Sequence, residues 1–142
     1  LTFPHLLSGI VLMGTGARLR VAPEVFEAVS QGKDFTEAAY APGTDPQLIQ
    51  EAEKEFGLTS AEVRYNDFLA CDRFDIMDQA DRIDVPALVL CGREDRLTPV
   101  KYSQYLADTL PKATLQIIPD AGHMVMWEQA RAVNASMTSF LA

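Results

Sequence analysis

Two side chains that can move protons follow two strand-like segments in the C-terminal part of the chain. Asp95 comes after the apolar residues 86–91, and His123 comes after a second apolar stretch at 114–118. Because parallel sheets present ligands beyond the carboxyl ends of their strands, we expect both side chains at one edge of a sheet. A carboxylate placed there keeps one imidazole nitrogen protonated and leaves the other free as a base. The spacing therefore predicts an Asp–His pair suited to acyl transfer.

Each member of this pair also has a structural interpretation. A histidine on a glycine-flanked loop, taken alone, is more often incidental than catalytic. Asp95 is equally suited to a turn or a helix N-cap just before Thr98. Glu94 and Asp120 are rival acids: Glu94 is displaced by one residue, and Asp120 is expected to shape the loop that holds His123.

The elements that must position the pair form a strand–helix–strand unit. Residues 86–91 and 114–118 are expected to be buried strands. Thr98 and Pro99 introduce the helix between them, Thr98 as its cap, and Pro111 prevents its continuation. A final helix over about 126–141 carries an apolar stripe that is expected to pack on the sheet.

A helical insertion is predicted between this unit and an earlier strand. Ile10–Met13 is a short apolar run bounded by glycines, typical of a strand buried on both faces. Helix signals follow one another after it, among them Asp45 before Pro46 and a capping box at Thr59 and Glu62. Insertions of this length tend to be lids or binding elements. We therefore divide the chain into a first core strand region, a helical cap, and a C-terminal core with the acid and histidine loops, at residues 1–21, 22–84 and 85–142.

Three stretches of the chain resemble the α/β-hydrolase family. The strand and acid loop of that family are similar to VPALVLCGREDRLTP, and its last strand, histidine loop and final helix are similar to LQIIPDAGHMVMWEQARAVNASMTSFL. The strand after the nucleophile's helix is similar to GIVLMGTGA. The resemblance implies a partial α/β-hydrolase fold with three parallel strands, flanking helices and an inserted helical cap. It also implies that Asp95 is the triad acid and His123 the triad base.

The chain departs from the family at the nucleophile. None of the serines lies in a G-x-S-x-G motif; they are Ser8, Ser30, Ser60, Ser103, Ser136 and Ser139. In the family, that motif and the oxyanion-hole donors precede the position matching Leu1. The resemblance therefore implies the C-terminal portion of a serine-type hydrolase of small esters or lactones, inactive alone, with either a longer source or another chain supplying the missing half.

Two other functions stay open at this stage. An epoxide or haloalkane hydrolase has an aspartate nucleophile at the same missing position, and Asp95 and His123 would then activate water. A non-catalytic interaction module would keep the sheet and the lid without turnover. The residue at the nucleophile position would distinguish the two enzymes.

Five side chains are candidates for the wall of a substrate pocket: Thr15, Tyr65, Phe68, Leu69 and Trp127. Thr15 follows the first strand and would border the site. One helix of the insertion carries Tyr65, Phe68 and Leu69, which are equally well explained as the ordinary apolar stripe of that helix. Trp127 follows His123 and would shield the imidazole from water, although a large aromatic residue at a helix start is as often simple packing.

Composition and charge argue against several classes of partner. The net charge of -8 disfavours nucleic acid, and no basic amphipathic stretch indicates a membrane surface. Cys71 and Cys91 form neither a metal-site spacing nor a disulfide framework, so we expect no metal, no organic cofactor and a cytoplasmic protein. We interpret the start of the chain as interior sequence and not as a signal peptide. Ile10–Met13 would lack its upstream neighbour, so we expect self-association through this edge or pairing with a complementary N-terminal half.

Overall fold

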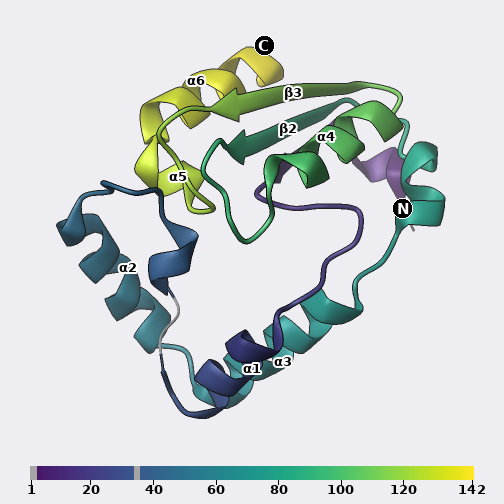
Figure 1. The fold of residues 1–142 in the computed structure, drawn as a ribbon. Helices are drawn as coiled ribbons and strands as arrows, with labels where there is room; N and C mark the ends of the chain where they lie inside the picture. The colour runs from purple at the N-terminus through teal and green to yellow at the C-terminus, as the bar shows by residue number, and fades with distance from the viewer. Residues whose placement is uncertain (1–2, 34–35) are drawn as a thin grey trace.

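The computed structural model describes residues 3–33 and 36–142, and within these residues the strands form one parallel sheet (Figure 1). The strands are β1 (Ile10–Met13), β2 (Ala87–Gly92) and β3 (Ala113–Ile118), arranged in the order β1-β2-β3. Ala87 of the central strand pairs with Ile10 on one side and with Ala113 on the other. The predicted α/β class with three parallel strands is therefore confirmed.

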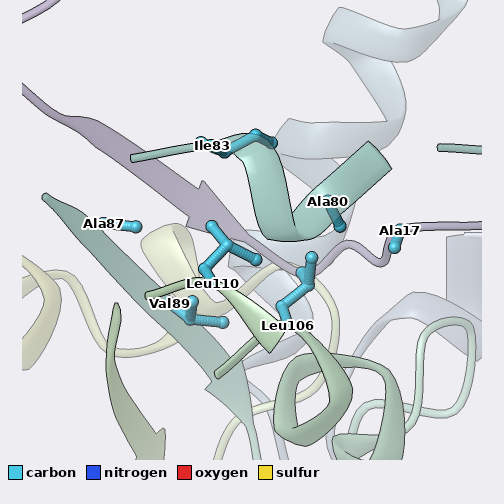
Figure 2. Packing of buried hydrophobic residues seen from close by; sticks show 7 residues of the cluster. All are labelled: Ala17, Ala80, Ile83, Ala87, Val89, Leu106 and Leu110. Carbon is cyan, nitrogen blue, oxygen red and sulfur yellow. The ribbon is translucent and has the colours of Figure 1, made fainter. Parts of the chain in front are cut away.

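The central strand is buried along its whole length because helices cover both faces of the sheet. One face is covered by α4 (Val100–Thr109) and the 3₁₀ helix η3 (Met77–Arg82), and Figure 2 shows Leu106 and Leu110 of this layer beside Val89. The other face is covered by α5 (Val125–Glu128) and α6 (Ala130–Leu141). The buried residues of this second face are Leu88, Leu90, Ile118, Ala121, Val125 and Val133.

Between β1 and η3 the chain is helical, as the sequence predicts. The elements are α1 (Pro23–Ser30), η2 (Thr36–Ala39), α2 (Pro46–Gly57) and α3 (Ala61–Arg73), and a further short 3₁₀ helix, η1 (Pro4–Leu6), precedes β1. Asp45 caps α2 as expected, because its carboxylate accepts from the backbone N–H of Gln47. The capping box at Thr59 is wrong by one residue: the Ser60 hydroxyl accepts from the N–H of Val63.

Two further local predictions in the C-terminal core are corrected. Thr98 does not cap α4: Pro99 is the N-cap residue, no side chain caps this helix, and the Thr98 hydroxyl lies between Asp95 and His123. The final helix is not continuous: Gln129, with φ −129° and ψ 48°, separates α5 from α6. The apolar stripe continues through this break, so the periodicity of the sequence gives no sign of it.

The insertion meets the sheet only in part. The helices α1 and α3 pack on each other and lie apart from the strands (Figure 1). A separate apolar cluster joins Ala39, Tyr40 and Ala52 to Leu97 after β2 and Met124 after β3. Among the described helices, none is both long and apolar enough to cross a membrane.

Candidate active site

Asp95 lies in the turn between β2 and α4 and is only 4% exposed. Its Oδ1 accepts hydrogen bonds from the backbone N–H groups of Leu97 and Thr98, at 2.9 and 2.8 Å. Its Oδ2 accepts from the hydroxyl of Thr98 at 2.8 Å. A buried carboxylate is tolerated when its oxygens are satisfied in this way. The role of Asp95 in the turn is therefore compatible with its proposed role as the acid of the pair, because the turn fixes the orientation of the carboxylate.

His123 lies in the loop after β3, and its side chain is 28% exposed. Its Nδ1 is 3.0 Å from Oδ2 of Asp95 and 3.2 Å from the hydroxyl oxygen of Thr98. Since the Thr98 hydroxyl donates its hydrogen to Asp95, both oxygens facing Nδ1 are acceptors, and we assign the proton to Nδ1. The opposite nitrogen, Nε2, forms no hydrogen bond with any residue that the structure describes. Nε2 is thus the nitrogen available to exchange a proton with a ligand.

The electrostatics of Asp95 favour its ionised form. Burial raises the pKa of this carboxyl, but hydrogen bonds from His123 and the backbone of Thr98, the charge of His123 and the Thr98 hydroxyl together lower the pKa below its usual value. The carboxylate is therefore a stable negative charge beside the imidazole. Such a charge stabilises an imidazolium when a proton reaches Nε2.

Close backbone packing fixes the two loops against each other. A Cβ at Gly92 would lie 2.1 Å from the carbonyl oxygen of Gly122, a separation that two such atoms do not adopt. Gly14, whose φ is +51°, lies against the imidazole, and a Cβ there would be 3.1 Å from Nδ1 of His123. The ring is therefore held between the end of β1 and the turn after β2.

Comparisons with known proteins identify the fold in which this pair lies. Residues 66–130 match the family model described as the alpha/beta hydrolase fold. A thermophilic esterase of known structure is 35% identical, with a TM-score of 0.85 over 99% of this chain and 58% of its own. The chain has the fold of the α/β-hydrolase family. A non-heme haloperoxidase of Rhodococcus erythropolis is 33% identical over 70% of this chain and 38% of its own length. The 3-oxoadipate enol-lactonase 2 of Acinetobacter baylyi is 24% identical over 98% of this chain and 56% of its own length. The chain thus spans about half, or less, of these relatives.

The rival acids of this α/β-hydrolase chain do not reach the imidazole. Glu94 and Asp120 are both exposed, and the carboxylate that accepts a hydrogen bond from Nδ1 of His123 is that of Asp95. Asp120 has φ 53°, a left-handed conformation that aspartate tolerates in turns, so it shapes the histidine loop as predicted.

The five predicted pocket residues are not gathered at one place. Thr15 lines a mostly apolar cavity of about 370 Å³ beside β1, and Trp127 on α5 is 38% exposed. Tyr65 on α3 packs edge-to-face on Phe26 of α1, with ring centroids 5.3 Å apart. Phe68 and Leu69, on the same helix, are half-buried. Their contact with a substrate stays a prediction.

The cysteines are both unpaired, and Cys91 is not placed to replace a serine nucleophile. Cys91 is fully buried in β2, and burial raises the pKa of its thiol, with the carboxylate of Asp95 adding to the rise. A thiol of this kind is inert. Within the described residues, no group of three or more His, Cys, Asp or Glu side chains is arranged to hold a metal ion.

Three contributions to this candidate site were missed by sequence reasoning. The Thr98 hydroxyl contacts both members of the pair. The backbone N–H of His123 donates to the carbonyl of Ala39 at 2.7 Å. Glu128 accepts from the N–H of Gly122 at 2.8 Å. Of these, only Glu128 is visible in the sequence, as an acid within the apolar stretch that follows His123. The contact with the carbonyl of Ala39 has no sequence signal, because every residue has a backbone carbonyl.

Proposed function

We propose that this chain is the acid-and-base portion of a serine-type α/β-hydrolase that acts on small esters or lactones. The observation that carries the proposal is the 3.0 Å contact between His123 Nδ1 and the buried Oδ2 of Asp95. The carboxylate has three further hydrogen bonds, so the pair is organised without a ligand. Preorganisation of this kind is what proton transfer in a transition state requires.

In the proposed mechanism His123 acts twice. Its Nε2 first accepts the proton of an attacking serine hydroxyl and then returns a proton to the leaving group. Asp95 holds the ring in the Nδ1–H tautomer and balances the positive charge while the imidazolium exists. The serine and the oxyanion-hole donors would come from sequence preceding Leu1 or from another chain, since no G-x-S-x-G motif occurs in residues 1–142.

The relatives support this assignment at the level of chemistry. They include esterases and an enol-lactonase, and the chain spans only part of each of these proteins. We further propose that residues 22–84 are the cap and that the chain alone does not turn over esters. The two unpaired cysteines fit a reducing cytoplasm, which is where we place the protein.

A chimaera with the thermophilic esterase tests the proposal. The stretch of that enzyme matched by this chain is replaced with residues 1–142, so the esterase supplies the elbow and the oxyanion hole. We expect hydrolysis of short p-nitrophenyl esters, and a loss of kcat of about 10⁴-fold in Asp95→Asn because the ring takes the wrong tautomer. His123→Ala should be at least as inactive, and Glu94→Gln, at an exposed acid in the same loop, should keep full activity. A chimaera that folds but shows equal rates in all variants would overturn the assignment of the pair.

The two alternatives give different outcomes. The coding sequence upstream of Leu1 should contain G-x-S-x-G after a strand pattern; an aspartate at that position would select halide or epoxide chemistry instead. A non-catalytic module predicts a folded chimaera with no activity, and no gain when an elbow-bearing fragment is added to the chain. Because the relatives include a haloperoxidase and a lactonase, the chimaera should be assayed with several classes of substrate.

A further inference from the structure

Glu128 joins the histidine loop to the helical insertion. The carboxylate is half-buried on α5, and its Oε1 accepts from the backbone N–H of Gly122 at 2.8 Å. Its Oε2 accepts from the backbone N–H of Ala41 and from the hydroxyl of Thr44, both at 2.8 Å. One side chain thus binds three donors, one in the loop next to His123 and two in a segment more than 80 residues earlier in the chain.

The same segment touches the histidine loop directly. The carbonyl of Ala39 accepts from the N–H of His123 at 2.7 Å and from that of Met124 at 3.2 Å. Gly122 leaves no room between the two backbones, because a Cβ on it would lie 2.7 Å from the carbonyl oxygen of Ala39 and from the N of Ala41. Residues 39–44, which we call the clasp segment, therefore form a packed and hydrogen-bonded backing for the loop.

The acid loop is held by the same clasp segment. The guanidinium of Arg96 donates to the carbonyl of Tyr40 at 3.3 Å. Apolar contacts reinforce this link, since Ala39 and Tyr40 pack with Leu97 and Met124, which flank the two loops. The clasp segment consequently contacts the loop of Asp95 and the loop of His123 at once.

We propose that Glu128 is a positioning residue for His123, acting through the clasp segment. This inference rests on the proposed function, in which His123 is the base. A carboxylate accepts all three hydrogen bonds, and bonds to a charged acceptor are about twice as strong as neutral ones. Without it, the N–H groups of Gly122 and Ala41 lose their acceptor, and the loop gains freedom to move the imidazole away from Asp95. The insertion thus contributes to the geometry of the base.

Glu128→Gln is the sharpest variant because it keeps the size of the side chain. One amide oxygen replaces two carboxylate oxygens, so the amide NH₂ must face the N–H of Ala41 or that of Gly122, and one acceptor is lost. Glu94→Gln is the matched control, since it removes the same charge from an exposed side chain in the neighbouring loop. Thr44→Val is a milder second variant, because it removes one donor and leaves the carboxylate in place.

Amide hydrogen exchange in the 142-residue chain, followed by NMR, tests the clasp. We expect the amides of Gly122 and His123 to exchange roughly tenfold faster in Glu128→Gln, and less so in Thr44→Val, consistent with the loss of one charge-assisted hydrogen bond. The amide of Leu90 in the buried central strand should keep its rate, which separates local loosening from global unfolding. Exchange at Gly122 and His123 that is equal in Glu128→Gln and Glu94→Gln would overturn the proposal, as would equal acceleration at Leu90.

A second measurement separates this inference from the proposed function. The chain has only two histidines, so the ring signals of His123 can be read against those of His5, which is exposed. The Nδ1–H signal of His123 should broaden or exchange faster in Glu128→Gln, while Asp95→Asn should abolish it. In the chimaera, Glu128→Gln should lower kcat about tenfold with little change in KM, because only the base is displaced. A normal Nδ1–H signal and normal kcat in Glu128→Gln would reject the clasp and leave the Asp–His pair intact; no effect of Asp95→Asn would reject the pair itself.

Discussion

The sheet with its covering helices differs from the helical insertion in how deeply its residues are buried. The central strand is buried at every position from Ala87–Gly92. In α3 (Ala61–Arg73), by contrast, none of the residues, all of which the structure describes, is fully buried. The two side chains of the proposed active pair both emerge from the buried part, in the turns after β2 and β3.

This difference indicates where rigidity is located in the molecule. A side chain at the end of a buried strand inherits the position of the strand, whereas a helix that packs only on another helix leaves its side chains free to adapt. Apart from η3, which packs on the sheet, the insertion meets the rigid part at residues 39–44, and there its backbone contacts the loop of His123. We infer that precision comes from the sheet and adaptability from α1 and α3.

The largest expected effect on stability follows from truncating a side chain in the core. Leu90 is 0% exposed in β2, and Leu90→Ala should lower the free energy of unfolding by about 3 to 5 kcal/mol through lost burial and the cavity left behind. Leu58, 80% exposed after α2, is the matched control, and Leu58→Ala should change stability by less than about 0.5 kcal/mol. Urea unfolding measures both. Equal losses at the two positions would refute the contrast between sheet and insertion.

The next effect concerns two glycines and has opposite signs in the two regions. Gly92→Ala would place a Cβ 2.1 Å from the carbonyl oxygen of Gly122, so the acid turn and the histidine loop must separate, at a cost of about 3 kcal/mol. Gly57 ends α2, and a Cβ there meets nothing within 4 Å. Gly57→Ala should therefore stabilise by about 0.5 to 1 kcal/mol through helix propensity. Thermal unfolding of the two variants should shift the midpoint in opposite directions.

The sequence predicted what depends on short stretches of chain. Continuous apolar runs located β1, β2 and β3, since strands buried on both faces need no polar alternation. The order of an acid turn and a histidine loop after two such strands was enough to select Asp95 and His123, which lie 3.0 Å apart. Helix caps were predicted to within a residue because they are set by neighbouring side chains.

What the sequence did not predict depends on contacts between distant segments. The hydroxyl of Thr98 was expected to cap a helix, but it donates to Asp95 and lies 3.2 Å from Nδ1 of His123, a residue 25 positions further along the chain. Glu128 contacts Ala41 and Thr44, and nothing in a linear pattern connects residues so far apart. The place of Tyr65 against Phe26 likewise follows from how α1 meets α3.

Acid should remove the stability that the ionised Asp95 contributes to the fold. The pKa of Asp95 lies below its usual value, so its contribution to stability is fully present above the pKa of an unfolded carboxyl, about 4, and is lost as the pH falls through the lower folded-state pKa. Asp95→Asn lacks this contribution at every pH. Urea unfolding between pH 7 and pH 2 should therefore show the gap in stability between the parent chain and Asp95→Asn closing toward the acid end. Glu94→Gln supplies the background, and a gap that widens toward acid would contradict the stated direction.

The smallest expected effect on folding, with a large effect on self-association, is that of Val11→Pro in β1. It is the edge strand of the described sheet, beside an apolar cavity of about 370 Å³, and we propose that the isolated chain self-associates there. The N–H groups of Ile10 and Gly14 donate toward β2, so by alternation the N–H of Val11 faces outward and that of Leu12 inward. Val11→Pro should remove an edge donor and lower the mass measured by light scattering at high concentration, while the chain stays folded. Leu12→Pro should instead unfold the chain, because this substitution removes an N–H that bonds to β2. A parent chain that stays monomeric at high concentration would show that this edge is not an association surface.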